Sequence, residues 1–211
     1  MTDLKKYFST PLYGMTAEDL SYSRDNISDV RDMLESGIRI IQYREKEKPG
    51  CEMYSQCVKI REMTRRAGAI FIIDDYADLA LAVEADGVHI GQDDLPIEAV
   101  RKIAGNKLII GMSTHSPEQA DDAIKRGADY IGVGPLYETH TKKNVCAPVG
   151  LSYLDYVVSY TDIPFVAIGG IKKHNLGEVY AHGAKCACLV TGIVAEPDIP
   201  GTVNELLKLV K

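Results

Sequence analysis

The sequence predicts an α/β fold, a single (β/α)8 TIM barrel that takes in residues 1–211 as one domain. Three observations predict it. Short apolar runs alternate with helical segments through eight units, without an evident linker. Several runs open on a similar turn, such as Ala85-Asp86-Gly87, and polar clusters follow the runs where strands would end. An open doubly wound sheet has the same periodicity and stays the structural alternative.

The predicted strands are short apolar runs bounded by glycine or polar residues. They are Leu12–Met15, Ile38–Tyr43, Ala69–Ile73, Gly87–Ile90, Leu108–Met112, Ala128–Gly134, Ile163–Ile168 and Lys185–Val190. Residues 1–11 are polar, and we expect a loosely packed N-terminal segment there.

Helix boundaries follow from caps. Ser28 is a good N-cap for a helix that ends at Gly37, and Ser116 precedes a proline suited to a first helical position. The other expected helices are Cys51–Ala67, Ala77–Ala85, one beginning at Pro96, Leu151–Tyr160, Asn175–His182 and Pro197–Val210.

Composition restricts the partners. The net charge of −6 argues against nucleic acid or an anionic membrane as a partner, so an anionic substrate needs a local cation cluster. No apolar run approaches the roughly 20 residues that span a bilayer. The first residues lack the apolar core of a signal peptide. Five scattered cysteines indicate reduced thiols and a cytoplasmic protein, and Cys186 and Cys188 alternate on what we expect to be one buried face.

Two pairs of carboxylates follow neighbouring strands. Asp74 and Asp75 end one apolar run, and Asp93 and Asp94 follow the next. A single acid after a strand usually caps a helix. Two pairs one βα unit apart favour a site for a hard cation such as Mg²⁺, which prefers oxygen ligands.

Cations and glycines end other strands. Gln42, Arg44 and Lys46 alternate, so an extended chain directs all three to one face, although such a charged stretch is more often a solvated loop. Gly169-Gly170 and Thr191-Gly192 follow the last two strands, where this fold often binds phosphate. A tight turn would also explain the glycines.

Two histidines are weaker indicators of a functional site than these clusters. His89 lies inside a short strand, which favours a hydrogen-bonded barrel residue over a catalytic base. His115 lies near a strand end but has no supporting motif. No nucleophile elbow, P-loop or dinucleotide fingerprint is present.

Taken together, the motifs resemble the thiamine-phosphate synthase family from Leu12 to about Ile193. The matching stretches are Gln42–Lys46, Ile73–Asp75, Ala85–Asp94, Gly111–His115, Gly132–Pro135, Thr139–Lys143 and Ala167–Ile171. The resemblance implies a (β/α)8 transferase that joins a hydroxymethylpyrimidine diphosphate to a thiazole phosphate, releasing pyrophosphate.

The resemblance also implies roles for residues. Asp75 and Asp94 would hold Mg²⁺, and catalysis would fall to Arg44, Lys46, Ser113 and Lys142. The implied substrate-binding residues are Gln42, Arg44, Lys46, Asp74, Ser113, Thr139, Thr141, Lys142, Gly170, Val190 and Thr191.

Asp74 departs from the family pattern, which has asparagine there. A carboxylate only accepts hydrogen bonds and adds negative charge beside phosphates. Two alternative functions stay open, a thiazole tautomerase-like paralogue and a non-catalytic barrel that binds phosphate ligands. The expected partners are small phosphorylated molecules, and whether the chain forms a homo-oligomer is left open.

Overall fold

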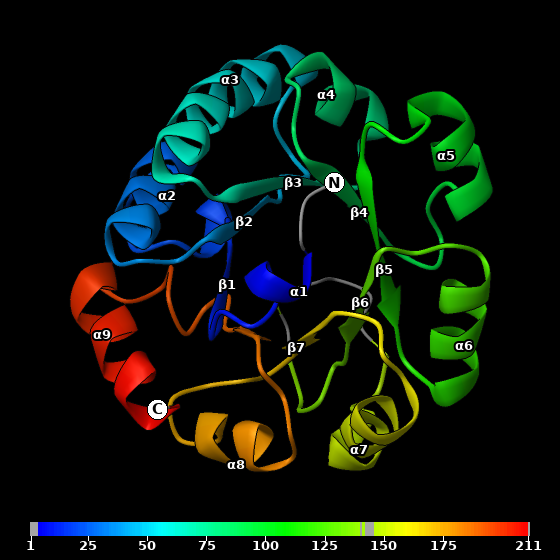
Figure 1. The fold of residues 1–211 in the computed structure, drawn as a ribbon. Helices are drawn as coiled ribbons and strands as arrows, with labels where there is room; N and C mark the ends of the chain where they lie inside the picture. Colours follow the sequence, from blue (N-terminus) through cyan, green and yellow to red (C-terminus); the bar gives the residue numbers. More distant parts are fainter. Residues whose placement is uncertain (1–3, 140, 142–145, 211) are drawn as a thin grey trace.

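Eight parallel strands close into a barrel in the computed structural model, which describes residues 4–139, 141 and 146–210. Each strand pairs with its neighbours along the chain, and β8 pairs with β1 to complete the ring. Figure 1 shows the ring viewed along its axis with helices around the outside. The strands are β1 (Leu12–Met15), β2 (Ile40–Tyr43), β3 (Ile70–Asp74), β4 (Gly87–Ile90), β5 (Ile109–Thr114), β6 (Tyr130–Val133), β7 (Phe165–Ile168) and β8 (Ala187–Cys188). The predicted barrel is confirmed.

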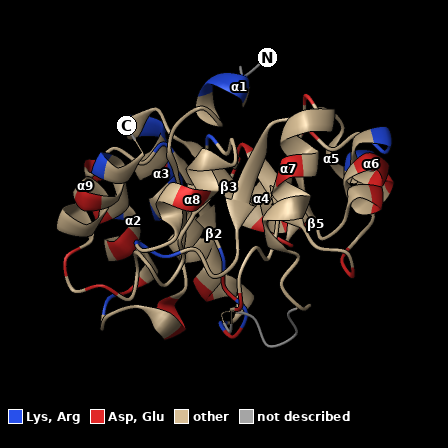
Figure 2. Ribbon diagram, turned by 90° about the horizontal axis from the view of Figure 1, so that it is seen from below, with Lys and Arg blue, Asp and Glu red and all other residues tan. Residues whose placement is uncertain are grey.

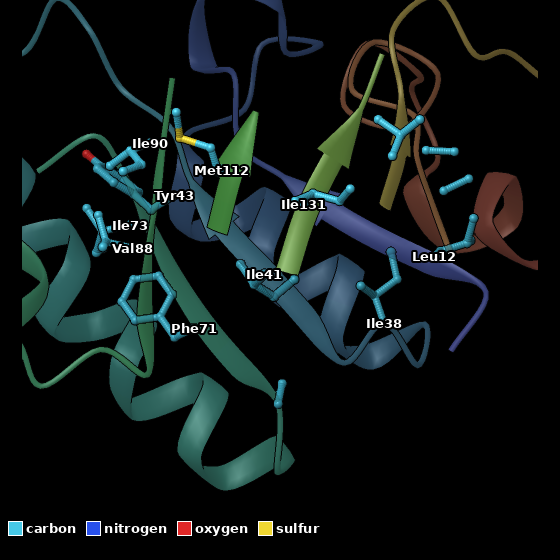
Figure 3. Packing of buried hydrophobic residues seen from close by; sticks show 14 of the residues in the cluster. Leu12, Ile38, Ile41, Tyr43, Phe71, Ile73, Val88, Ile90, Met112 and Ile131 are labelled. Atoms are coloured by element: carbon cyan, nitrogen blue, oxygen red, sulfur yellow. The ribbon is translucent and has the colours of Figure 1, made fainter. Parts of the chain in front are cut away.

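One helix follows each strand, and the apolar layer between them forms the larger core. The helices are α2 (Asn26–Glu35), α3 (Gly50–Ala67), α4 (Ala77–Ala82), α5 (Ile97–Ala104), α6 (Pro117–Lys125), α7 (Gly150–Tyr160), α8 (Leu176–Ala181) and α9 (Ile199–Leu209). Outward side chains of the strands, such as Ile41, Phe71 and Ile131, are fully buried in this layer, part of which Figure 3 shows.

A second core fills the barrel interior. Inward side chains alternate with the outward ones, so the strands are apolar on both faces. The interior cluster includes Ile40, Ile72 and Tyr130, and it also buries Cys186 and Cys188 on the same face, as predicted. Gly111 makes room for Tyr130, because a Cβ at Gly111 would lie 2.2 Å from the tyrosine ring.

The N-terminal segment differs from the prediction. We expected residues 1–11 to be loosely packed, but in the described part helix α1 (Leu4–Tyr7) leads into Phe8, which is only 5% exposed. The Phe8 ring lies 4.6 Å from the Tyr130 ring, centroid to centroid. Burial of Phe8, with Leu4 and Tyr7 packed against the same cluster, thus anchors the segment across the amino end of the barrel, where Figures 1 and 2 show α1.

Most helix ends match the caps read from the sequence. Ser116 caps α6 with Pro117 in its first turn, and Gly68 ends α3 in a left-handed conformation. The start of α2 was predicted wrongly: Asp25, not Ser28, is the N-cap, and its carboxylate accepts the Ser28 N–H at 2.7 Å. The helix begins earlier than predicted because Asn26, the residue after Asp25, is fully buried and its side chain donates a hydrogen bond to Gln56.

Five strands differ in length from their predicted runs: β5 is longer, and β2, β6, β7 and β8 are shorter. β5 continues through Ser113 and Thr114, because both residues keep their pairing with β6. β8 contains only Ala187 and Cys188, whereas we expected Lys185–Val190. Among the described residues, no helix has the length and apolar character needed to cross a bilayer.

Candidate active site

A cavity of about 790 Å³ opens at the carboxyl ends of the strands. The loops after all eight strands contribute to its lining. Figure 2 shows acidic and basic positions in the loops at this end, opposite α1. The cavity brings together the predicted residues that the structure describes, namely Gln42, Arg44, Lys46, Asp74, Asp75, Asp94, Ser113, Thr139, Thr141, Gly170, Val190 and Thr191. Lys142 lies outside the described residues.

Cationic side chains enter the cavity from the end of β2. Gln42 and Arg44 are 1% and 8% exposed, and Lys46 lines the same cavity, so the alternation predicted from the sequence holds. The Thr16 hydroxyl fixes the backbone of Arg44 by accepting its N–H at 2.8 Å and donating to its carbonyl at 3.1 Å. Glu45 accepts the N–H of Lys46 at 2.8 Å, which holds the turn that carries Lys46.

Carboxylates at the end of β3 face these cations. The Lys46 ammonium lies 2.9 Å from Oδ2 of Asp74 and also pairs with Asp75, and Arg44 Nε lies 3.9 Å from Asp74. Burial lowers the pKa of Lys46, but Asp74 and Asp75 outweigh that effect, so its pKa lies above the usual value. Arg44 and Lys46 therefore balance the negative charge at the end of β3.

Asp75 occupies an unusual environment. Its φ of 65° lies in the left-handed region, which turns the chain sharply after β3. Burial raises the pKa of Asp75 to about 6. The negative charge of Asp74 adds to the rise, Lys46 opposes it, and Asp94 raises the pKa by the smallest amount. Perturbed carboxylates in a cleft are typical of functional sites.

Asp75 and Asp94 both line the cavity and offer carboxylate oxygens, the kind of ligand that Mg²⁺ prefers. Asp94 makes the smallest contribution to the raised pKa of Asp75, and a divalent cation beside both carboxylates would offset that contribution. The described residues contain no group of three or more acidic, histidine or cysteine side chains that could hold a metal by themselves. Magnesium commonly binds through one or two carboxylates together with waters and substrate phosphates.

Asp94 has a structural contact as well. Its Oδ2 accepts the N–H of Gly91 at 2.6 Å, which closes the turn after β4. Gln92 in the same turn donates to the carbonyl of Ser113 at 2.6 Å and so ties the β4 and β5 loops together. The turn thus fixes the position of the Asp94 carboxylate through its Oδ2.

A chain of hydrogen bonds runs through the barrel interior to Ser113. Tyr13 Oη lies 3.1 Å from Tyr130 Oη, which lies 2.9 Å from His89 Nδ1, and His89 Nε2 lies 2.9 Å from Ser113 Oγ. Burial raises the pKa of both tyrosines, so their hydroxyls stay protonated. His89 is therefore the hydrogen-bonded barrel residue that we predicted, and it orients Ser113.

The loops after β6, β7 and β8 form a second end of the cavity. Gly170 has a φ of +65°, and a Cβ there would lie 2.5 Å from the Glu138 carbonyl, so only glycine fits. Thr139 and Thr141 lie close together, with their hydroxyl oxygens 3.2 Å apart. Val190 and Thr191 line the cavity at the end of β8.

Sequence reasoning missed Lys172 and Gln92. Lys172 lines the cavity and its ammonium donates to the Thr191 hydroxyl. A cation two residues beyond Gly170 at a strand end was the available signal, and the adjacent Lys173 obscured it. His115 lines the cavity too, and its Nδ1 bonds to the Gly134 carbonyl.

The chain is similar in sequence and in structure to known thiamine-phosphate synthases. A family model described as thiamine monophosphate synthase matches residues 12–193. A thiamine-phosphate synthase of Pelotomaculum thermopropionicum is 58% identical over 94% of this chain and 91% of the relative, and one of Lawsonia intracellularis is 56% identical over 92% and 90%. The structure of thiamine phosphate pyrophosphorylase from Pyrococcus furiosus has a TM-score of 0.88 and 39% identity, covering 97% of both chains.

Proposed function

Because the chain belongs to the thiamine monophosphate synthase family, we propose that its cavity binds a pyrimidine diphosphate at one end and a thiazole phosphate at the other. The chain is a transferase of the thiamine-phosphate synthase type, which joins the hydroxymethylpyrimidine group to the thiazole phosphate and releases pyrophosphate. One barrel domain comprising the whole chain would carry both ends of the site.

The main support for a site with two ends is that two sets of polar residues line the same cavity from different strands. Arg44, Lys46 and the carboxylates come from β2, β3 and β4, whereas Gly170 and Thr191 come from β7 and β8. The first group suits a diphosphate with a metal, and the second suits a single phosphate approached by backbone and hydroxyl donors.

Charge development explains the first group. As the carbon–oxygen bond to the diphosphate breaks, negative charge gathers on the departing pyrophosphate. Arg44 and Lys46 stabilise this charge, and both cations are already in position before the reaction begins. We assign Lys142, from the loop after β6, to the same task. Asp75 and Asp94 would hold Mg²⁺, which when bound supplies further neutralisation of the pyrophosphate charge.

The remaining methylene carbon carries positive charge, which the electron-rich aminopyrimidine ring stabilises. Gln42 and Ser113 would hold that ring, with Ser113 oriented by His89. The thiazole nitrogen captures the carbon with its own lone pair, so the reaction needs no protein nucleophile and no strong general base.

The thiazole phosphate would lie against Gly170, Val190 and Thr191, with Thr139 and Thr141 from the opposite loop. The two alternative functions have less support, because relatives at up to 58% identity over most of the chain are thiamine-phosphate synthases. We also propose a cytoplasmic location, since all five cysteines are free thiols and three of them are buried.

Incubation of the purified chain with both substrates and Mg²⁺ tests the function, with thiamine phosphate detected by chromatography. Product should form with both substrates present and cease on addition of excess chelator. A folded preparation that binds thiamine phosphate but yields no product with Mg²⁺ would instead identify the chain as a binding protein.

A further inference from the structure

Lys172 is a cation at the phosphate end of the cavity to which the resemblance assigns no role. We propose that its ammonium binds the phosphate of the thiazole substrate and makes the site select the phosphorylated thiazole over the free alcohol. This inference rests on the proposed function and adds a specificity-determining residue to it.

The position of Lys172 supports this role. It follows the Gly169-Gly170 turn at the end of β7, and its side chain lines the cavity. Its ammonium donates a hydrogen bond to the hydroxyl of Thr191, at the end of β8. The lysine therefore joins the two loops between which the phosphate would lie.

Lys172 differs from its neighbour Lys173 in its charged surroundings. Among the residues that the structure describes, no carboxylate lies within ion-pair distance of its Nζ, although the side chain is half-buried. Its neighbour Lys173 is exposed and pairs with Glu205 at 2.7 Å. A partly desolvated ammonium beside one neutral hydroxyl is expected to attract an anion, and a phosphate offers charge-assisted hydrogen bonds.

Hydrogen bonds and close packing fix the loop that carries Lys172. The buried side chain of Asn175 accepts the N–H of Lys172 at 2.7 Å and donates to the carbonyl of Gly170 at 3.1 Å. Gly170 is packed against Tyr137 and Glu138 so closely that it accepts no side chain. The ammonium is thus delivered from a rigid turn, which limits the ordering cost of binding.

A contact to a non-reacting phosphate acts equally in the ground state and in the transition state. Its loss should therefore raise KM for the thiazole phosphate and leave kcat nearly unchanged. The free thiazole alcohol offers no charge to Lys172, so kcat/KM for the alcohol should be little affected. Discrimination between the two thiazoles should fall accordingly.

Three variants test the inference: Lys172→Met, Lys172→Arg and, as a matched control, Lys173→Met. Calorimetric titration with the thiazole phosphate and steady-state kinetics for each substrate are the measurements. Lys172→Met should weaken thiazole-phosphate binding and raise its KM roughly tenfold to a hundredfold, the range for one lost charged hydrogen bond. KM for the pyrimidine diphosphate should not change, Lys172→Arg should retain most of the affinity, and Lys173→Met should behave as the wild type.

The outcomes separate this inference from the proposed function. If the wild type forms thiamine phosphate and Lys172→Met binds the thiazole phosphate as tightly as Lys173→Met does, the assignment of Lys172 is wrong and the function stands. A fall in kcat for Lys172→Met with unchanged KM would also overturn it. A wild type that forms no thiamine phosphate contradicts the function itself, whatever the variants bind.

Discussion

The ammonium of Lys46 lies 2.9 Å from Oδ2 of Asp74, at the point where β3 leaves the barrel. Asp74 is only 3% exposed, and Arg44 approaches the same oxygen to 3.9 Å. The carboxylate that departs from the family pattern is thus balanced by the cations that would otherwise hold the diphosphate. A diphosphate that binds there must compete with Asp74 for Lys46 and Arg44.

Substitution Asp74→Asn should therefore leave the affinity for the pyrimidine diphosphate equal or improve it, by up to about tenfold. The change removes a competing anion and restores two N–H donors. A magnesium titration of wild type and variant at fixed substrate is the measurement. An unchanged magnesium midpoint is expected, and a large shift to higher concentration would show instead that Asp74 is a metal ligand.

Asp94 combines a turn contact with the proposed metal contact, and two substitutions separate them. Asp94→Asn keeps an oxygen that can accept the Gly91 N–H but loses the charge, whereas Asp94→Ala loses both. Both variants should lose turnover on the order of a hundredfold or more if Mg²⁺ is essential. Turnover is measured against magnesium concentration, with thermal unfolding as the control for folding. Full activity of Asp94→Asn in excess chelator would exclude the metal role.

The two ends of the cavity should respond separately to substitution. Lys142→Ala should mainly slow the loss of pyrophosphate, because a contact to the leaving group acts most in the transition state. Thr191→Glu should raise KM for the thiazole phosphate, on the order of tenfold or more, by placing a carboxylate where a phosphate binds. Steady-state kinetics with each substrate varied in turn will decide. The assignment of the two ends would be reversed if Lys142→Ala changed only the kinetics of the thiazole phosphate and Thr191→Glu changed only those of the pyrimidine diphosphate.

The Phe8 anchor predicts a stability effect remote from the site. Phe8→Ala should lower the free energy of unfolding by about 3–5 kcal/mol, the usual cost of removing a buried aromatic ring. Phe8→Leu should cost less, roughly 1.5 kcal/mol or below, because it refills most of the volume. Urea denaturation measures both. Equal stability of Phe8→Ala and wild type would mean that the segment contributes nothing to the barrel.

Much of this fold could be predicted because its strands are apolar on both faces and end abruptly in polar residues. Asp74 marks the end of β3 in the sequence as it does in the structure. Local caps such as Ser116 were equally readable. The start of α2 was not, because Asp25 and Ser28 are both good N-caps and the choice depends on the burial of Asn26.

Long-range contacts account for the rest. Nothing near Phe8 in the sequence indicates that its ring meets Tyr130. The alternation of Gln42, Arg44 and Lys46 predicted their common face, but not that Lys46 would rest between Asp74 and Asp75. The hydrogen bond of Lys172 to Thr191 joins two strand ends, so it becomes visible only when the barrel closes.

The shortness of β8 leaves few paired positions at its joints to β7 and to β1. With only Ala187 and Cys188 in the strand, the joint to β1 rests on two paired positions, whereas β5 and β6 share four. Backbone amides at this joint should exchange with deuterium before those of β5. Because Val190 and Thr191 lie just beyond the strand, after Leu189, a phosphate held there would slow that exchange, so hydrogen exchange at this joint would report on occupancy of the site.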